Sequence, residues 1–289
     1  MKKYDDPKEY KEALLSPHII PQKIMKDITI PESVFKYRQF GDYLYDSLGG
    51  KVFFSLPSKI NANDPDDCIV WIDKQKCVEH IMDICACEER LARYFYHMLA
   101  KNWINPYTDN KGKSHRGLQD MVKIGCFSTV HPEEKTDLMW KTFSNTGGYC
   151  IEYETKQECF YPANIIFLPV CYELDSRYDD TDYVLRIIDF LKEQLDKGIE
   201  NPSLDESFVP QGYNHVLFKP SCYCGEYEWR VIVTCNRDTE YFDEQLINGG
   251  KKFMSKCIKC VYIRKDSVEE DAKKVIDYCS TNGIAIKEV

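Results

Sequence analysis

The residues best suited to chemistry are two glutamates, Glu226 and Glu228, in the segment CYCGEYEWRVIV at positions 222–233. The alternation of polar and apolar residues predicts a β-strand in which Glu226, Glu228 and Arg230 share one face, opposite an aromatic and aliphatic face. A charged strand face lies either in solvent or in an active site. In an active site, a fixed carboxylate stabilises positive charge that develops on a reacting group.

Two further segments offer groups that bind or orient a substrate. Arg38 lies in a predicted strand at 34–40, and Ser128 and Thr129 close another at 124–129. The planar guanidinium of arginine matches phosphate oxygens in a bidentate geometry that lysine reproduces poorly. The alternatives are a surface or structural ion pair for Arg38 and ordinary strand hydroxyls for Ser128 and Thr129.

These segments belong to a succession of predicted strands and helices. Residues 1–31 are polar and contain prolines, and they predict an irregular lead-in with one short helix near 8–15. Residues 32–289 predict a single α+β domain with a helical insertion at 77–117, where apolar residues recur near helical spacing. The other expected elements are strands at 51–55, 149–153 and 165–172, and helices at 138–143 and 183–195.

The C-terminus predicts a strand-helix-strand unit. A strand at 259–263 is followed by a capping box, Ser267-x-x-Glu270, which marks the start of a helix. Gly283 marks the end of that helix, and a strand at 284–287 follows.

The composition restricts the class of protein. The formal net charge of -9 over 289 residues argues against bulk binding of nucleic acid, which requires a basic surface to displace counterions. No apolar run approaches the ~18 residues that span a bilayer, and the N-terminal residues lack the apolar centre of a signal peptide. We therefore expect a cytoplasmic protein whose 14 cysteines are mostly reduced thiols.

Metal sites are weakly indicated. The cysteine pairs at 222–224 and 257–260 are poorly spaced for zinc, and buried or inert thiols are the simpler interpretation. The acidic run at 60–68 carries oxygen ligands but lacks the ligand spacing of a calcium loop, so we expect a capping turn there. We expect no bound metal.

Several short motifs, taken in order, resemble those of a bacterial family. They are Tyr37-Arg38, FFSLPSKINANDPDD at 53–67, CFST at 126–129, LMWKTFSNTGGYCIEY at 138–153 and EYEWR at 226–230. The family they resemble is catalogued as domain of unknown function 2971, and the match covers roughly residues 34–289. Phe143 stands where that family usually shows tyrosine. This resemblance implies no established activity.

A more distant resemblance carries chemistry. Arg38, Ser128-Thr129 and Glu226-x-Glu228 are similar in type and order to the Arg, Ser-Thr-Ser and Glu-x-Glu motifs that mono-ADP-ribosyltransferases present on three strands. Val130 replaces the third residue of the Ser-Thr-Ser pattern, and about ninety residues separate successive motifs. The resemblance implies an ADP-ribosyltransferase-like mixed β core with helical insertions, and NAD as a substrate.

The roles of individual residues follow from this resemblance alone. Glu228 would bond the nicotinamide ribose, Ser128 would hold that glutamate, and Glu226 would engage or activate the acceptor. The residues expected to bind the dinucleotide are Arg38, Tyr37, Thr129 and Trp140. For Trp140 the alternative is a place in the core. The residues expected in an acceptor loop are Phe218, Lys219 and Tyr223; alternatively, that loop only packs its own aromatic side chains.

The leading hypothesis is an NAD-consuming enzyme that transfers ADP-ribose to a macromolecule or hydrolyses NAD, as a bacterial toxin or an antiviral defence effector. Cleavage of the N-glycosidic bond develops oxocarbenium character on the ribose, which a carboxylate at Glu228 would stabilise. The alternative is a non-enzymatic module of a defence or stress system that binds a nucleotide or a protein. A metal-dependent nuclease built on Asp64, Asp67 and the two glutamates fits the acidic chain least.

Overall fold

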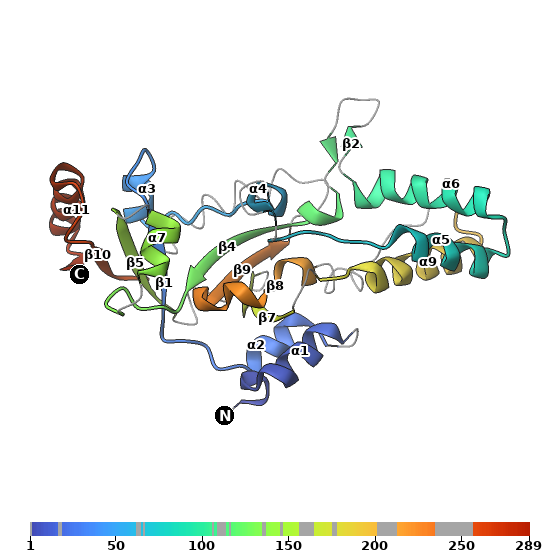
Figure 1. Ribbon diagram of the computed structural model, residues 1–289, viewed down its shortest axis with the longest axis horizontal. Coiled ribbons are helices and arrows are strands. Elements are labelled where there is room, and N and C mark those ends of the chain that lie inside the picture. The colour runs from blue at the N-terminus through green and yellow to red at the C-terminus, as the bar shows by residue number, and fades with distance from the viewer. Residues whose placement is uncertain are drawn as a thin grey trace.

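The computed structural model describes residues 2–16, 19–61, 65, 67–105, 107–108, 114–115, 117–134, 137–144, 147–155, 165–174, 178–200, 213–234 and 257–289. These residues form a mixed α+β fold around one large sheet, with helices at both ends of an elongated molecule (Figure 1). The expected α+β class is therefore confirmed, as a mostly antiparallel sheet accompanied by several helices.

Seven strands form the large sheet, and all neighbours are antiparallel except β10 and β11. In spatial order the strands are β11 (Ala285–Glu288), β10 (Ile258–Ile263), β5 (Tyr149–Glu154), β1 (Ser33–Arg38), β4 (Val122–Ser128), β9 (Glu228–Thr234) and β6 (Ile165–Pro169). The strands that end at Arg38 and Ser128, and the strand that begins at Glu228, are thus adjacent in space.

Helices cover both faces of this sheet. They are α1 (Pro7–Leu15), α2 (Pro21–Lys26), α3 (Leu44–Leu48), α7 (Leu138–Ser144) and α11 (Glu269–Asn282). Because successive side chains of a strand point to opposite faces, Ile151 of β5 packs into the main core with Leu48 of α3 and Val275 of α11. Its neighbour Cys150 packs on the other face, in a smaller core that includes Trp140 of α7.

The N-terminal residues form helices that pack on the main core through a few buried side chains, in contrast to the irregular lead-in expected for 1–31. Helix α1 confirms the short predicted helix, and α2 follows with proline at its first position. Asp6 caps α1 by accepting hydrogen bonds from two backbone N–H groups. Tyr10 and Ile24 are buried in the main core, and the Tyr10 hydroxyl donates to the carbonyl of Pro169 at 2.5 Å.

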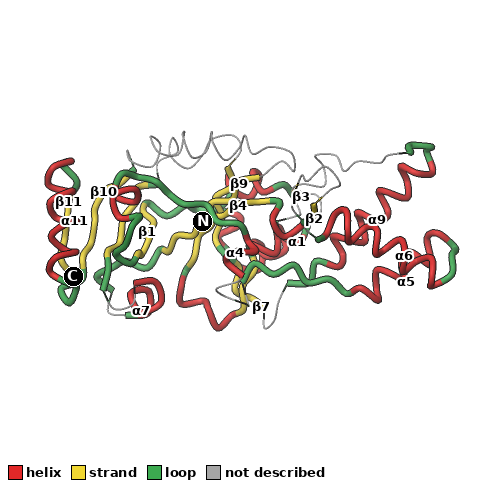
Figure 2. The backbone as a smooth tube through the Cα atoms, turned by 90° about the horizontal axis from the view of Figure 1, so that it is seen from above, coloured by secondary structure: helices red, strands yellow, loops and turns green. Residues whose placement is uncertain are grey.

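Three helices form an arm that projects from one end of the sheet (Figure 1, Figure 2). They are α5 (Lys74–Cys85), α6 (Glu89–Leu99) and α9 (Thr181–Asp196), and α6 continues into the π-helical turn η2 (Ala100–Ile104). The arm has its own hydrophobic core, which includes Val78, Ala92 and Val184, one from each helix. The helical insertion expected at 77–117 is therefore only part of this arm, since α9 comes from a distant stretch of sequence.

Short elements connect these larger parts. They are η1 (Lys3–Asp5), α4 (Pro57–Asn61), β2 (Tyr107–Thr108), β3 (Ser114–His115), η3 (Leu118–Asp120), β7 (Cys171–Leu174), η5 (Asn214–Val216), β8 (Phe218–Pro220) and η6 (Ser221–Glu226). Within the described ranges, no helix combines the length and the apolar character needed to cross a membrane.

Two expected strands differ in the structure. Residues 51–55 do not form a strand, and only Ser55 pairs, in an isolated bridge with Ile124. The segment 165–172 divides into β6 and β7 around Val170, whose N–H donates to the carbonyl of Glu228. After this point the chain leaves the large sheet, and β7 pairs with β8.

The capping box expected at the start of α11 does not form. The residue that precedes α11 is Val268, which provides no side-chain cap. The Ser267 hydroxyl instead donates to the carbonyl of Gly148 at 3.3 Å and so ties the start of α11 to β5. The predicted end of the helix is confirmed, because Gly283 has a φ of 67° and closes it in the left-handed conformation.

Gly148 allows β1 and β5 to approach closely. A Cβ atom at this position would lie 2.3 Å from the carbonyl oxygen of Arg38, so the backbone of β1 would have to shift. We expect Gly148→Ala to lower the free energy of unfolding by about 2 kcal/mol or more, measured by urea denaturation. Gly147→Ala is the matched control, since a Cβ atom there meets only Ser267, at 3.9 Å. Equal losses in both variants would contradict this explanation.

Candidate functional site

A cavity of about 560 Å³ lies beside β1, β4 and the start of β9, and we call it the main cavity. Seven of the residues that the ADP-ribosyltransferase resemblance implies line it: Tyr37, Arg38, Ser128, Lys219, Tyr223, Glu226 and Glu228. Its volume falls within the range of pockets that hold small-molecule ligands. The structure therefore brings together residues from three widely separated segments.

The register of the sheet explains how these segments meet. Ser128 lies directly opposite Glu228 across β4 and β9, and opposite Phe35 across β4 and β1. β1 and β4 pair at this one position, whereas β1 pairs with β5 along its whole length. Beside the single contact, the ammonium of Lys36 spans the two strands and donates to the carbonyl of Cys126 at 2.6 Å. The main cavity is lined by residues of both strands around this junction.

Glu226 reaches the main cavity from a turn rather than from the strand. β9 begins at Glu228, and Tyr227 between the two glutamates has a φ of 43° and an exposed side chain. The expectation that both glutamates share one strand face is therefore wrong. The Ser128 hydroxyl donates to the carbonyl of Glu226 at 2.6 Å and accepts from the N–H of Val130 at 3.0 Å. Ser128 thus fixes the turn that carries Glu226.

The carboxylates belong to a buried charge cluster that consists of Asp67, Lys219, Glu226, Glu228 and Arg230. Arg230 is completely buried and forms a two-pronged pair with Glu228, at 2.8 and 2.9 Å. Its guanidinium also donates to Asp67 at 2.6 Å. The strand face that Glu228 and Arg230 share is buried. The alternative in which this charged face lies in solvent is therefore wrong.

Lys219 holds the other side of the cluster. Its ammonium lies 2.8 Å from Glu226, 3.3 Å from Asp67 and 3.9 Å from Glu228. It also lies over the ring of Tyr223, at 4.6 Å from the centroid. One lysine therefore contacts all three carboxylates, and the five groups together retain one negative charge when ionised.

The cluster shifts the proton affinities of its members in opposite directions. Burial would raise the pKa of Asp67, but the charges of Arg230 and Lys219 outweigh it and hold that pKa well below its ordinary value. Burial would lower the pKa of Lys219, but the nearby carboxylates raise it. For Glu226 burial prevails over the attraction of Lys219, and its pKa is raised. The carboxylate of Glu226 therefore takes up a proton more readily than that of Asp67.

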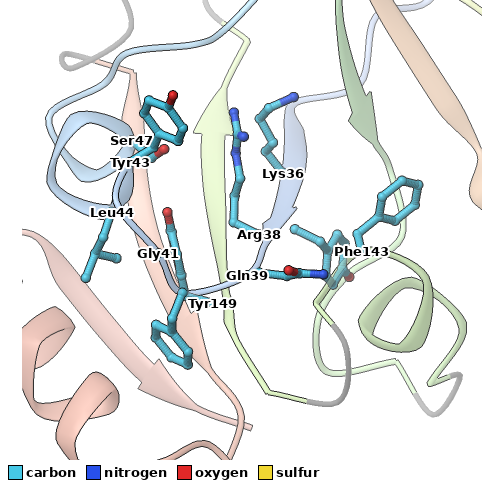
Figure 3. Close-up of a pocket in the computed structure, with 11 residues that line it drawn as sticks. Lys36, Arg38, Gln39, Gly41, Tyr43, Leu44, Ser47, Phe143 and Tyr149 are labelled. Carbon is cyan, nitrogen blue, oxygen red and sulfur yellow. The ribbon is translucent and has the colours of Figure 1, made fainter. Parts of the chain in front are cut away.

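The wall formed by β1 is positively charged. Lys36 and Arg38 lie two positions apart on this strand and extend side by side (Figure 3). The Arg38 guanidinium lies over the ring of Phe53 at 5.5 Å, and its Nε is buried without a hydrogen-bond partner. Among the described residues, no carboxylate forms an ion pair with Lys36 or Arg38. This wall is suited to bind an anion.

A second cavity of about 440 Å³ adjoins the main cavity, and Lys36, Tyr37, Arg38 and Phe143 line both. In Figure 3 the two cationic side chains lie between Tyr43 on one side and Phe143 on the other. The two cavities therefore meet at the positively charged wall.

Three of the predicted site residues lie outside the main cavity. Thr129 is partly exposed and faces the carbonyl of Tyr227, at 3.4 Å. Trp140 is buried in the core against Tyr37, with ring centroids 5.0 Å apart. Phe218 is buried and stacks on Tyr178. These positions favour the structural alternatives for Trp140 and Phe218.

The residues that line the main cavity do not form a metal site. No group of three or more histidine, cysteine or acidic side chains suited to hold a metal was found in the described residues. Of the acidic run, Asp67 belongs to the charge cluster, whereas Asn63, Asp64 and Asp66 lie outside the described residues. Burial raises the pKa of Cys126, so this thiol is a poor nucleophile near neutral pH.

Lys36 was not predicted as a site residue, and Asp67 was considered only for a metal-dependent nuclease, yet both line the main cavity. Lys36 is recognisable only by its spacing of two from Arg38, which places both on the same face of a strand. Asp67 stands in a run of turn-forming residues, and its pairing with Arg230 spans 163 positions. Long-range pairs of this kind are not visible in one sequence.

Comparison with protein-family models, with curated proteins and with solved structures gave no match to this chain. The geometry described above therefore stands as the basis for any functional inference.

The charge cluster makes Asp67 important for stability. Asp67→Asn would remove one carboxylate from the two buried cations, Lys219 and Arg230. We therefore expect the free energy of unfolding to fall by about 3 kcal/mol. Because the pKa of Asp67 is lowered on folding, its stabilising effect is present above the ordinary aspartate pKa and is lost as the pH falls. The free energy of unfolding should therefore differ less between the variant and wild type in acid than at pH 7, as measured by denaturation at both pH values.

The matched control for Asp67→Asn is Asp266→Asn, which removes a surface pair with Arg264 at 2.7 Å. Surface pairs contribute about 1 kcal/mol or less. Similar losses in both variants would show that the buried pairs of Asp67 contribute no more to stability than a surface ion pair does.

Binding of an anion at the β1 wall should depend on pH. Burial and the neighbouring Arg38 lower the pKa of Lys36 to about 8, so its charge is present at pH 7 and largely lost at pH 9. We expect ADP-ribose, whose diphosphate charge is constant over this range, to bind about fivefold to tenfold more weakly at pH 9 by calorimetry. Lys36→Met should bind weakly at both values, and the surface variant Lys273→Met should behave as wild type. Equal affinity of wild type at both pH values would contradict this role.

Proposed function

We propose that this chain is an NAD-consuming enzyme with an ADP-ribosyltransferase-like core, which transfers ADP-ribose to a macromolecule or to water. The observation that carries the proposal is the convergence of Arg38, Ser128, Glu226 and Glu228 on one cavity, from neighbouring strands and the turn before β9. Successive motifs are separated by about ninety residues, so their proximity is a product of the fold. A toxin or an antiviral defence effector would use this activity.

The charges of the main cavity suit the chemistry of NAD. The substrate carries a negatively charged diphosphate, and its ribose becomes positively charged as the bond to nicotinamide breaks. Lys36 and Arg38 provide cations without carboxylate partners in the described structure, and Arg forks bind phosphate oxygens well. Glu226 and Glu228 provide carboxylates in the same cavity. Positive and negative groups are therefore presented to opposite parts of one ligand.

Glu228 is the residue proposed to stabilise the ribose cation. Its carboxylate is held by two hydrogen bonds from Arg230, and its N–H donates to the hydroxyl of Tyr172 at 3.0 Å. A charge fixed in this way needs little reorganisation during reaction. One negative charge remains when all five groups of the charge cluster are ionised. The pairing of Glu228 with Arg230 therefore does not cancel the attraction of the cluster for a cation.

Glu226 is the residue proposed to activate the acceptor. Its pKa is raised by burial, and a base is most effective when its pKa approaches the working pH. Ser128 contributes by holding the backbone of Glu226, whereas the resemblance alone implied a contact with the catalytic glutamate. Lys219 contacts the carboxylate of Glu226 and thereby fixes its orientation.

One observation favours the alternative of a non-enzymatic nucleotide-binding module. Both glutamates are already engaged, Glu228 by Arg230 and Glu226 by Lys219, as expected for carboxylates with a structural role. Such a module would bind ADP-ribose at the cationic wall without releasing nicotinamide. Product formation therefore separates the two functions.

The proposal predicts that Glu228→Gln abolishes nicotinamide release. The amide keeps the shape of the side chain but removes the charge that stabilises the transition state, and we expect a decrease of about a hundredfold or more. Purified protein is incubated with NAD, alone and with cell lysate, and free nicotinamide is measured by chromatography. Glu152→Gln is the matched control, since Glu152 is a buried sheet glutamate that is paired with Lys259 and does not line the main cavity.

Release by wild type and Glu152→Gln, with none from Glu228→Gln, would support the proposed enzyme. Equal release by all three proteins would overturn the role of Glu228. Absence of release from wild type under both conditions, together with binding of ADP-ribose, would favour the binding module.

A further inference from the structure

Helix α6 has two apolar stripes, and only one of them is buried. Ala92, Tyr96 and Leu99 face the core of the arm. The second stripe, which we call the outer stripe, consists of Leu91, Tyr94, Phe95 and Met98. Its side chains are 46%, 57%, 42% and 37% exposed, respectively. The periodicity of these residues predicted a helix, and the structure leaves this face of it in contact with solvent.

The spacing of the outer stripe matches that of a helix used for recognition. Its members lie at positions i, i+3, i+4 and i+7, so they form one continuous surface along two turns. Large aromatic side chains dominate the binding energy of protein interfaces. Exposed apolar residues that are contiguous in this way mark an interaction site more often than isolated ones do.

Basic residues border the outer stripe along one side. They are Arg90, Arg93, His97 and Lys101, which are exposed and recur at helical spacing. Arg93 is paired with Glu89 at 2.5 Å. Within the described part of the chain, Arg90, His97 and Lys101 form no ion pair. This local positive charge contrasts with the net charge of -9 of the whole chain.

We propose that the outer stripe and its basic border dock an acidic amphipathic helix of a partner protein. The apolar residues of such a helix would cover Tyr94 and Phe95, and its carboxylates would meet Arg90 and Lys101. This inference concerns the arm and is independent of the proposed function of the main cavity.

The same features disfavour other occupants. If two α6 helices paired antiparallel about a two-fold axis, the basic border of each would meet its own copy, and Arg90 and Lys101 of the two chains would repel. Leu91 and Met98 cannot stack on bases as aromatic residues do. An anionic membrane is an extended surface and would also face the acidic remainder of the chain, whereas a single helix would contact only the arm.

The test uses the full chain and a display library of helix-length random peptides. Peptides are selected on wild type and counter-selected on the double variant Leu91→Ser, Phe95→Ser. We expect the selected peptides to combine acidic residues with apolar residues at helical spacing. By fluorescence anisotropy, their affinity should fall about tenfold or more in the double variant, and about threefold in Arg90→Glu and in Lys101→Glu.

Controls distinguish docking from misfolding. Lys273→Glu reverses an exposed charge on α11 and should not change the affinity. The double variant should unfold at the wild-type temperature, because its two side chains lie outside the core; if it unfolds earlier, the two charge reversals decide the result. Peptides without acidic residues, or peptides unaffected by the charge reversals, would overturn the proposal. A stripe-dependent dimer in sedimentation, or stripe-dependent binding to phosphatidylglycerol vesicles, would also overturn it by identifying another occupant.

Discussion

The burial of Arg230 is the constraint on which the site depends. An unpaired guanidinium at this depth would be strongly destabilising, so its donors are directed to several acceptors. These are Glu228 on its own strand, Asp67 in the segment that follows α4, and the carbonyl of Val216 in η5, at 2.8 Å. Asp67 lies 163 positions from Arg230 in the sequence, and Val216 lies 14 positions from it. Satisfying one side chain therefore fixes the segments that meet at the floor of the main cavity.

This pairing also gives the main cavity its polarity. Inside the cluster, the three carboxylates are paired with Lys219 and Arg230. On the wall formed by β1, Lys36 is bonded to a neutral carbonyl, and the guanidinium of Arg38 lies over the ring of Phe53. Buried charges are normally paired, so the free energy gained by binding an anion is greatest at this wall. The fold thus places a cationic wall that can bind an anion next to fixed carboxylates. Both a binding module and an enzyme could use this arrangement.

Local patterns predicted much of the fold, whereas long-range pairs determined the rest. The strand at 149–153 and the glycine after α11 depend on neighbouring residues, and both were predicted from the sequence. The strand expected to include Glu226 failed because Tyr227 adopts a left-handed conformation that alternation cannot reveal. The approach of Arg38, Ser128 and Glu228 was expected only from a resemblance in motif order. Their registers across β1, β4 and β9 provide its physical basis.

The arm and the main cavity are joined by a short, well-anchored connection. Asp73, six positions after Asp67, caps α5, and its own N–H donates to the Thr181 hydroxyl at the start of α9, at 2.7 Å. Trp71 pairs with Asp179 just before that helix. Both helices are thus fixed at their bases by the chain that leaves the charge cluster. The arm has a separate core, and its outer stripe is thus linked to the main cavity through these contacts at its base. A partner held there would be positioned relative to the site without requiring a change in the sheet.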